Sequence, residues 1–121
     1  MADPLGFDKL RAKLNRATTP LEVESVISEI ERNKNLETDS RRSLLSLARE
    51  LFRYLTERDA SLAAISNGIR SAELEIVVRR IRTAVSLDDI VAATAIVRSS
   101  SLSDPIKVKL IAVMKKRKSS T

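Results

Sequence analysis

Signals for the start of a helix recur along the chain, and they constrain the fold more than any other feature. Thr19-Pro20-Leu21-Glu22 places a capping threonine before a proline in the first helical position. A glutamate three residues after the threonine is the residue that returns the capping bond. Ser86-Leu87-Asp88-Asp89 repeats this pattern with an aspartate in the last position. Two well-defined helices are therefore expected to begin here.

Little in the rest of the chain favours any other structure. Only two glycines and three prolines interrupt its 121 residues, so the sequence predicts an all-α fold, a compact bundle of six to seven helices. Further helix starts are marked at Asp39-Ser40, Ser71 and Asp104-Pro105, and a helix end at Asn67-Gly68. The expected helices span residues 5–17, 20–33, 39–58, 60–67, 72–85, 87–98 and 104–116.

The expected helices also repeat. A shift of 67 residues places Phe7, Leu10, Leu14, Ala17, Val23, Val26 and Ile30 on Leu74, Val77, Ile81, Ala84, Ile90, Ala93 and Val97. A shift of 66 places Leu36, Leu44, Leu45, Leu47 and Ala48 on Leu102, Leu110, Ile111, Val113 and Met114. Amphipathic helices also match by periodicity alone, but three consecutive helices with matched loops and caps favour a duplicated three-helix unit, with copies at about 5–57 and 72–117.

The length and composition favour one folded domain. A chain of this length fits a single core, and its 43% of hydrophobic and 31% of charged residues are typical of globular proteins. We expect a single domain over residues 1–117 and a flexible basic end at 118–121. No apolar run approaches the ~20 residues of a membrane span. We therefore expect an intracellular protein with no membrane partner.

The chain lacks the usual groups of catalysis. Cysteine and histidine are absent, which removes the thiol nucleophile, the commonest general base and the commonest transition-metal ligand. Glu22, Glu24, Glu29 and Glu31 lie at seven-residue spacings, but no Glu-x-x-His partner accompanies them. No Gly-rich phosphate loop is present. We predict a protein that is not an enzyme, with no cofactor, metal site or small-molecule substrate.

Basic side chains form stripes along several expected helices, on faces other than the apolar ones. Lys9, Lys13 and Arg16 form the first stripe, in which the side chains fall within about 60° of one another around the helix axis. Arg42, Arg49 and Arg53 form the second stripe, in which they fall within about 40°. Arg49 and Arg53 lie ~6 Å apart along the helix axis, comparable with neighbouring phosphates of one nucleic-acid strand. The ordinary alternative is that these cations only solubilise exposed faces. Arg79, Arg80 and Arg82 form a further basic cluster.

The net charge of +6 is concentrated near the C-terminus, where residues 101–121 carry six basic side chains and one acidic one. Lys115, Lys116, Arg117 and Lys118 are consecutive, a pattern typical of phosphate binding or nuclear import. A solubilising tail that complements the negative end of the preceding helix is the alternative. If the source is a eukaryote or a eukaryotic virus, this cluster favours a nuclear location for the protein. In any other source we expect the protein in the cytoplasm.

These features favour binding of nucleic-acid backbone without sequence specificity. Single-strand binders stack bases on aromatic side chains, but this chain has only Phe7, Phe52 and Tyr54. We therefore expect a duplex as the partner, contacted through the two basic stripes, the cluster at Arg79, Arg80 and Arg82, and the cations of residues 115–118.

A second interpretation starts from the expected helix at 87–98, which is apolar around most of its circumference. Its outer positions are Val91, Ala92, Ala95 and Ile96, where the matching helix of the first copy carries Glu24, Ser25, Ser28 and Glu29. Such a helix either runs through the middle of a bundle or forms a contact with another chain. The second alternative predicts a protein-interaction adaptor or a self-associating homo-oligomer.

Overall fold

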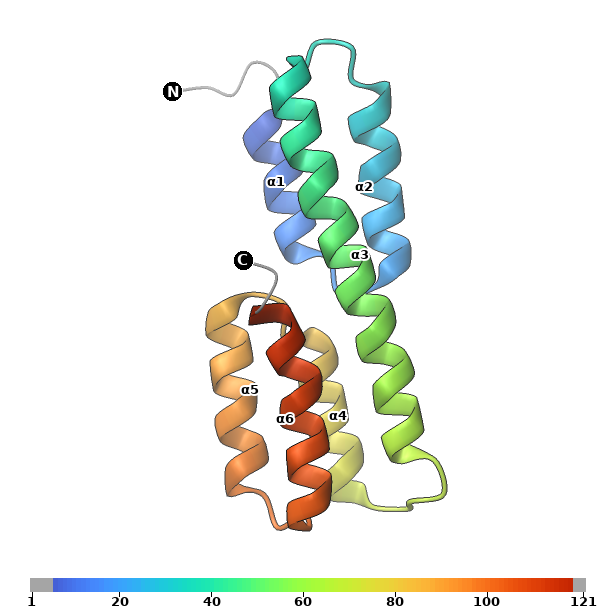
Figure 1. The fold of residues 1–121 in the computed structure, drawn as a ribbon, viewed down its shortest axis with the longest axis vertical. Coiled ribbons are helices and arrows are strands. Elements are labelled where there is room, and N and C mark those ends of the chain that lie inside the picture. The colour runs from blue at the N-terminus through green and yellow to red at the C-terminus, as the bar shows by residue number, and fades with distance from the viewer. Residues whose placement is uncertain (1–5, 119–121) are drawn as a thin grey trace. The chain divides into compact units, whose positions relative to one another are not determined.

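The structure is a computed structural model that describes the backbone of residues 6–118 and the side chains of residues 6–117. Within this range every regular element is a helix, which confirms the all-α prediction, and there are six helices (Figure 1). They are α1 (Phe7–Arg16), α2 (Pro20–Arg32), α3 (Thr38–Ser66), α4 (Ala72–Thr83), α5 (Leu87–Ser99) and α6 (Asp104–Lys118).

The helix starts predicted at Thr19 and Ser86 are confirmed by hydrogen bonds from their capping side chains. The hydroxyl of Thr19 accepts a bond from the backbone N–H of Glu22 at 3.2 Å. Ser86 accepts from the N–H of Asp89, also at 3.2 Å. The carboxylate of Glu22 accepts bonds from the hydroxyls of Thr18 and Thr19. Each cap satisfies one of the N–H groups that a helix start leaves without a partner.

Gly68 follows the end of α3 with a φ of 77°, the left-handed conformation that the Asn67-Gly68 pair predicted. The N–H of Ile69 donates to the carbonyl of Ser66, which closes the last turn. Glycine adopts this conformation without the steric penalty that a Cβ would add.

The predicted break at residue 59 is wrong, because α3 runs unbroken over 29 residues. Residues 56–62, TERDASL, contain neither glycine nor proline, so nothing local ends the helix. Arg58, the last residue of the predicted helix 39–58, is 2% exposed. Its Nη1 donates to the carbonyl of Arg82 at 2.7 Å, and Nε and Nη2 donate to Oδ1 of Asp59.

The chain divides into two compact units, residues 1–55 and 56–121. In the first unit α1 lies beside α2 (Figure 1). The side chains at the apolar spacings of its helices are buried, as the periodicity predicts. They are Leu10, Leu14, Val23, Val26, Ile30, Leu44, Ala48 and Leu51.

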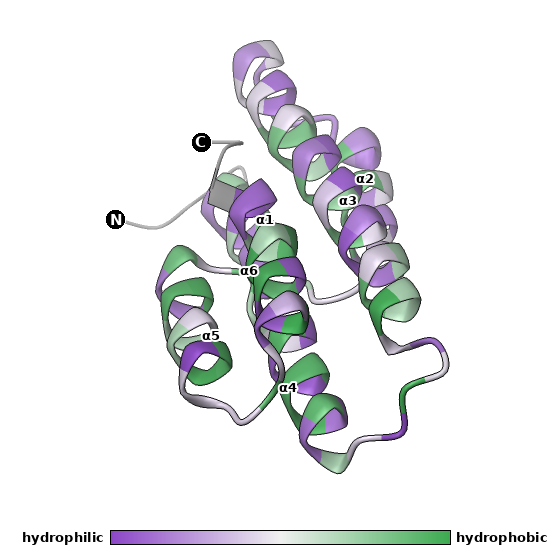
Figure 2. Ribbon diagram, turned by 60° about the horizontal axis from the view of Figure 1, so that its bottom comes forward, coloured by the Kyte–Doolittle hydropathy of each residue, from purple (hydrophilic) through white to green (hydrophobic). Residues whose placement is uncertain are grey.

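In the second unit α5 packs against both α4 and α6. Its buried apolar residues include Leu74, Val77, Ile81, Ile90, Ala93, Val97, Leu110, Val113 and Met114. Figure 2 shows that α5 is hydrophobic along most of its length, whereas α2 and α3 carry alternating hydrophilic residues. The expected single domain over residues 1–117 stays a prediction. Lys118 is the last residue of α6, and the remainder of the expected flexible end, 119–121, lies outside the described residues.

Candidate functional site

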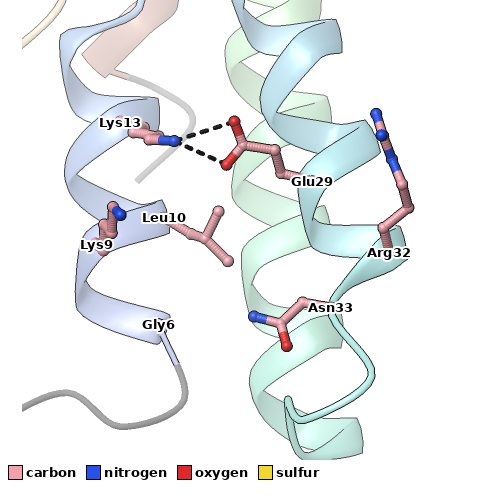
Figure 3. Close-up of a pocket in the computed structure, with 7 residues that line it drawn as sticks. All are labelled: Gly6, Lys9, Leu10, Lys13, Glu29, Arg32 and Asn33. Atoms are coloured by element: carbon pink, nitrogen blue, oxygen red, sulfur yellow. Dashed lines mark hydrogen bonds and ion pairs between the residues drawn. The ribbon is translucent and has the colours of Figure 1, made fainter.

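The first predicted basic stripe borders a hollow of about 390 Å³ between α1 and α2 (Figure 3). Lys13 does not face solvent freely, because its Nζ lies 2.8 Å and 3.0 Å from the two carboxylate oxygens of Glu29 on α2. Lys9 and Arg16 are exposed. Arg32, which the stripe did not include, also lines this hollow. Since Glu29 neutralises the central cation, the stripe presents less positive charge than its sequence suggested.

The second predicted stripe, here called the α3 arginine row, consists of Arg42, Arg49 and Arg53. All three side chains are exposed, and none has a hydrogen bond or ion pair to any part of the chain that the structure describes. Arg49 and Arg53 border a depression of about 680 Å³ between α2 and α3, with Glu24 on its other side. The row thus lies on one face of one continuous helix and is free to bind an external anion.

The third cluster is on α4, where Arg79, Arg80 and Arg82 are exposed, as the sequence predicted. Arg79 and Arg80 border a shallow depression with Ile76 and Thr83. The carbonyl of Arg82, in contrast, lies inward and accepts the bond from Arg58. This cluster is in the second unit, whereas the α3 arginine row is in the first.

The C-terminal cations are not four equivalent members of a flexible end, because residues 115–118 belong to α6. Lys115 is exposed, while Lys116 lies 3.8 Å from a carboxylate oxygen of Glu57. Arg117 is 9% exposed and its Nε donates to the carbonyl of Val85 at 3.1 Å. The helical periodicity of α6 turns Arg117 towards the interior of its unit. The side chain of Lys118 lies outside the described residues.

The predicted apolar patch on α5 is only partly one surface. Val91 is 70% exposed, so within its unit α5 is not a central, surrounded helix. Val91 and Ala95 border a groove of about 320 Å³ between α5 and α6. Ala92 and Ile96 do not line this groove; Ile96 is 39% exposed and Ala92 is half-buried.

Sequence reasoning missed the residues that complete this groove, which is here called the α5–α6 groove. Ile111 and Met114 of α6 and Ile90, Thr94 and Arg98 of α5 line it. Arg98 follows Val91 by seven residues, so helical periodicity could have placed the two on one face. No signal in the sequence pairs that face with α6, because the pairing of two helices is set by tertiary packing.

The carboxyl group of Glu73, near the start of α4, has a lowered pKa. Hydrogen bonds from the hydroxyl and then the backbone N–H of Ser101 lower the pKa of Glu73. These bonds tie the loop between α5 and α6 to α4. In the part of the chain that the structure describes, no group of three acidic residues is placed to hold a metal ion.

Comparisons with protein-family models, with curated proteins and with solved structures find no match for this chain. Of the helices between residues 6 and 118, none combines the length and hydrophobicity that crossing a membrane requires. A function must therefore be argued from the surfaces described above.

Proposed function

We propose that this chain is a non-enzymatic protein that binds the backbone of duplex nucleic acid inside the cell. The observation that carries the proposal is the α3 arginine row. Its three guanidinium groups are exposed and make no hydrogen bond or ion pair with the described chain. Arginine is well suited to this role because its planar group can give two parallel hydrogen bonds to a phosphate.

The spacing of the row supports contact with successive phosphates. At 1.5 Å per residue, Arg42 and Arg49 are ~10.5 Å apart along α3, and Arg49 and Arg53 are ~6 Å apart. Ser46 is exposed between them, within about 40° of Arg42 on the helix circumference, and its hydroxyl can donate to a phosphate oxygen. Glu24 borders the same depression as Arg49 and opposes an anion inside it, so the nucleic acid is expected to contact the exposed guanidinium groups of the row without entering the depression.

A salt titration tests the proposal. Three arginine–phosphate contacts should give a slope of about −2.7 in log K against log salt concentration on a duplex. The triple variant R42E/R49E/R53E should lose this salt-dependent binding, measured by fluorescence anisotropy with labelled duplex DNA and duplex RNA. If the intact protein does not bind either duplex at ~50 mM salt, where backbone contacts are strong, the proposal is wrong.

The matched control changes three exposed cations that lie outside every predicted stripe. Arg11, Lys34 and Arg70 are exposed and make no hydrogen bond or ion pair with the described residues. The variant R11E/K34E/R70E has the same change of net charge as the first triple variant. If it loses as much affinity, the attraction depends on net charge alone and the row has no special role.

A second candidate function is protein interaction, either as an adaptor or through self-association. The specific observation in its favour is the exposure of apolar side chains on α5, with Val91 70% and Leu87 44% exposed. Apolar surface gathered on one side of a small unit is typical of a protein-binding site. Size-exclusion chromatography with light scattering, repeated over a range of protein concentrations, would reveal self-association.

We also infer that the chain is a duplicated three-helix unit, as the sequence repeat predicts. Pro20–Arg32 corresponds to Leu87–Ser99 under the shift of 67, and α3 and α6 begin at positions that correspond under the shift of 66. A contact missed by sequence reasoning supports the inference further. Arg41 donates to the carbonyl of Glu31, and the corresponding Lys107 donates to the carbonyl of Arg98. Both cations thereby bind the C-terminal end of the preceding helix, which carries partial negative charge.

A further inference from the structure

We propose that the α5–α6 groove binds an amphipathic helix of a partner protein that carries acidic side chains on both flanks of its apolar face. The inference rests on the second candidate function, to which it adds the site and the chemistry of the partner. It is independent of nucleic-acid binding by α3.

The floor of the groove is suited to an apolar occupant. Ile90 and Met114 are buried beneath it, and Ile111 is half-buried. Thr94 is the one described lining residue with a hydroxyl, and this hydroxyl donates to the carbonyl of Ile90 at 2.8 Å in its own helix. The floor thus leaves no lining hydroxyl without a partner, and a ligand gains most there by burying apolar side chains.

The walls add exposed apolar surface on the α5 side. Val91 is 70% exposed, Ala95 is exposed as well, and both border the groove. Two antiparallel helices joined by a short loop form the walls (Figure 1). A third helix laid along such a groove can bury residues at positions i, i+3, i+4 and i+7 of one face.

The charges at the two ends of the groove select the partner. Among the described residues that line it, only Arg98 and Lys115 are ionisable. Both are exposed, and neither side chain has a hydrogen bond or ion pair to the described residues. Lys107 lies near Arg98 but donates to its carbonyl, so its ammonium group is partly engaged. Because none of the described lining residues carries a carboxylate, the groove is complementary to a ligand with negative charge.

The positions of these two cations also set the pattern of the ligand. Arg98 is on the α5 wall and Lys115 on the α6 wall. Because the helices are antiparallel, Lys115 lies near the level of Ile90 and Val91, with which it lines the groove. That level is ~10.5 Å from Arg98 along the axis. The ligand should therefore carry carboxylates on opposite flanks, one and a half to two turns apart, which is about 8 to 11 Å.

The same charges argue against a second copy of this chain as the occupant. Two grooves that face each other would bring Arg98 and Lys115 of both copies into one interface, with no acidic residue among the described residues of the lining. Like charges buried together disfavour such a contact. An acidic helix instead neutralises both cations while covering the exposed surface of Val91.

The test uses two synthetic helical peptides of about 14 residues, ~21 Å long, each stapled to hold the helix. Both carry the same leucine face, and the flanking positions are glutamate in one and lysine in the other. Fluorescence anisotropy with the full-length protein should show binding of the glutamate peptide and at least about tenfold weaker binding of the lysine peptide. If the glutamate peptide does not bind, both the groove assignment and the acidic partner are wrong.

Charge reversal locates the binding. R98E/K115E should weaken binding of the glutamate peptide about tenfold or more and strengthen binding of the lysine peptide. The matched control R79E/R80E has the same charge change on α4 and should leave the preference for glutamate in place. Equal loss in both variants would mean that the peptide responds to net charge, which overturns the groove assignment but leaves a protein-interaction function standing.

The apolar contact is tested separately. Val91→Ser should lower the affinity for the glutamate peptide about fivefold, as expected when the burial of one small aliphatic side chain is lost. Ile76→Ser, at a position 64% exposed on α4, should have no effect. Light scattering of the intact protein and sedimentation with phosphatidylserine vesicles complete the test. If the intact protein self-associates and both Val91→Ser and R98E/K115E abolish this, the occupant is a second copy of the chain. If it binds vesicles and the same variants abolish that binding, the occupant is a membrane. Either result would overturn the proposal.

Discussion

Replacement of Arg58 should reveal how strongly one buried cation stabilises the second unit. The side chain is 2% exposed, and its Nη1 donates to the carbonyl of Arg82 at 2.7 Å. That carbonyl is in the last turn of α4, where no intrahelical partner is available. Arg58 therefore stabilises the C-terminal end of α4 from a position on α3, and we expect its replacement by alanine to destabilise the unit.

The magnitude follows from the separate contacts. A hydrogen bond from a charged donor contributes about 1.5–3 kcal/mol. The pair with Asp59, whose side chain is 38% exposed, adds about 0.5 kcal/mol after solvent screening. Loss of the packed aliphatic stem adds about 1 kcal/mol, while removing a buried charge recovers part of its desolvation energy. We expect Arg58→Ala to lower the free energy of unfolding by about 3 kcal/mol.

Arg58→Met separates packing from hydrogen bonding. Methionine retains an apolar stem and removes the charge, so the remaining penalty is the unpaired carbonyl of Arg82, about 1–2 kcal/mol. Urea unfolding followed by circular dichroism at the helical band measures both variants. Arg53→Ala, at an exposed position on the same helix, is the control and should change stability by less than about 0.5 kcal/mol. The reasoning would be refuted if Arg58→Ala lowered the free energy of unfolding by less than about 1 kcal/mol, or if Arg58→Met lowered it by more than Arg58→Ala does.

Three further predictions concern single contacts. The bonds from Ser101 lower the pKa of Glu73. The stability that they contribute should therefore be fully present above the ordinary carboxyl pKa of about 4.3 and be lost as the pH falls through the lowered pKa. Glu73→Gln should remove this pH dependence from the midpoints of urea unfolding, and an unchanged acid profile would contradict the assignment. Thr19→Ala and Ser86→Ala remove caps at corresponding positions, and each should lower stability by about 1 kcal/mol in denaturant unfolding; a large effect at only one of them would argue against equivalent roles. Gly68→Ala should destabilise the chain by about 1 kcal/mol in thermal unfolding because alanine is strained at a φ of 77°, and a gain in stability would show that this conformation is not retained.

The local structure of this protein could be predicted because its causes lie within a few residues of one another. The caps at Thr19 and Ser86, the helix end at Gly68 and the buried apolar spacings follow from contacts within one turn of helix. The exposure of the α3 arginine row followed from the same periodicity. The break predicted at residue 59 was wrong on local grounds, because residues 56–62 contain neither glycine nor proline. The burial of Arg58 has a different origin, since its side chain binds the carbonyl of Arg82, which is 24 residues away in the sequence.

The availability of each cation was decided by tertiary structure. Lys13 and Glu29 are 16 residues apart in the sequence, yet they form an ion pair. Arg117 resembles its basic neighbours in sequence but is buried against the carbonyl of Val85, 32 residues away. A helical wheel gives the direction in which a side chain points but not what lies there. It therefore could not separate paired or buried cations from the free arginines of α3.

The amino-acid sequence alone determined that this protein is helical, where most of its helices begin and end, and which face of most helices is buried. These properties depend on capping, on backbone conformation and on a period of 3.6 residues, all of which are local. Only the tertiary structure decided that Val91 and Ala95 meet Ile111 and Met114 to form the α5–α6 groove. The reason is physical: a groove exists only where two helices pack, and that packing depends on the shapes of side chains distant in the sequence.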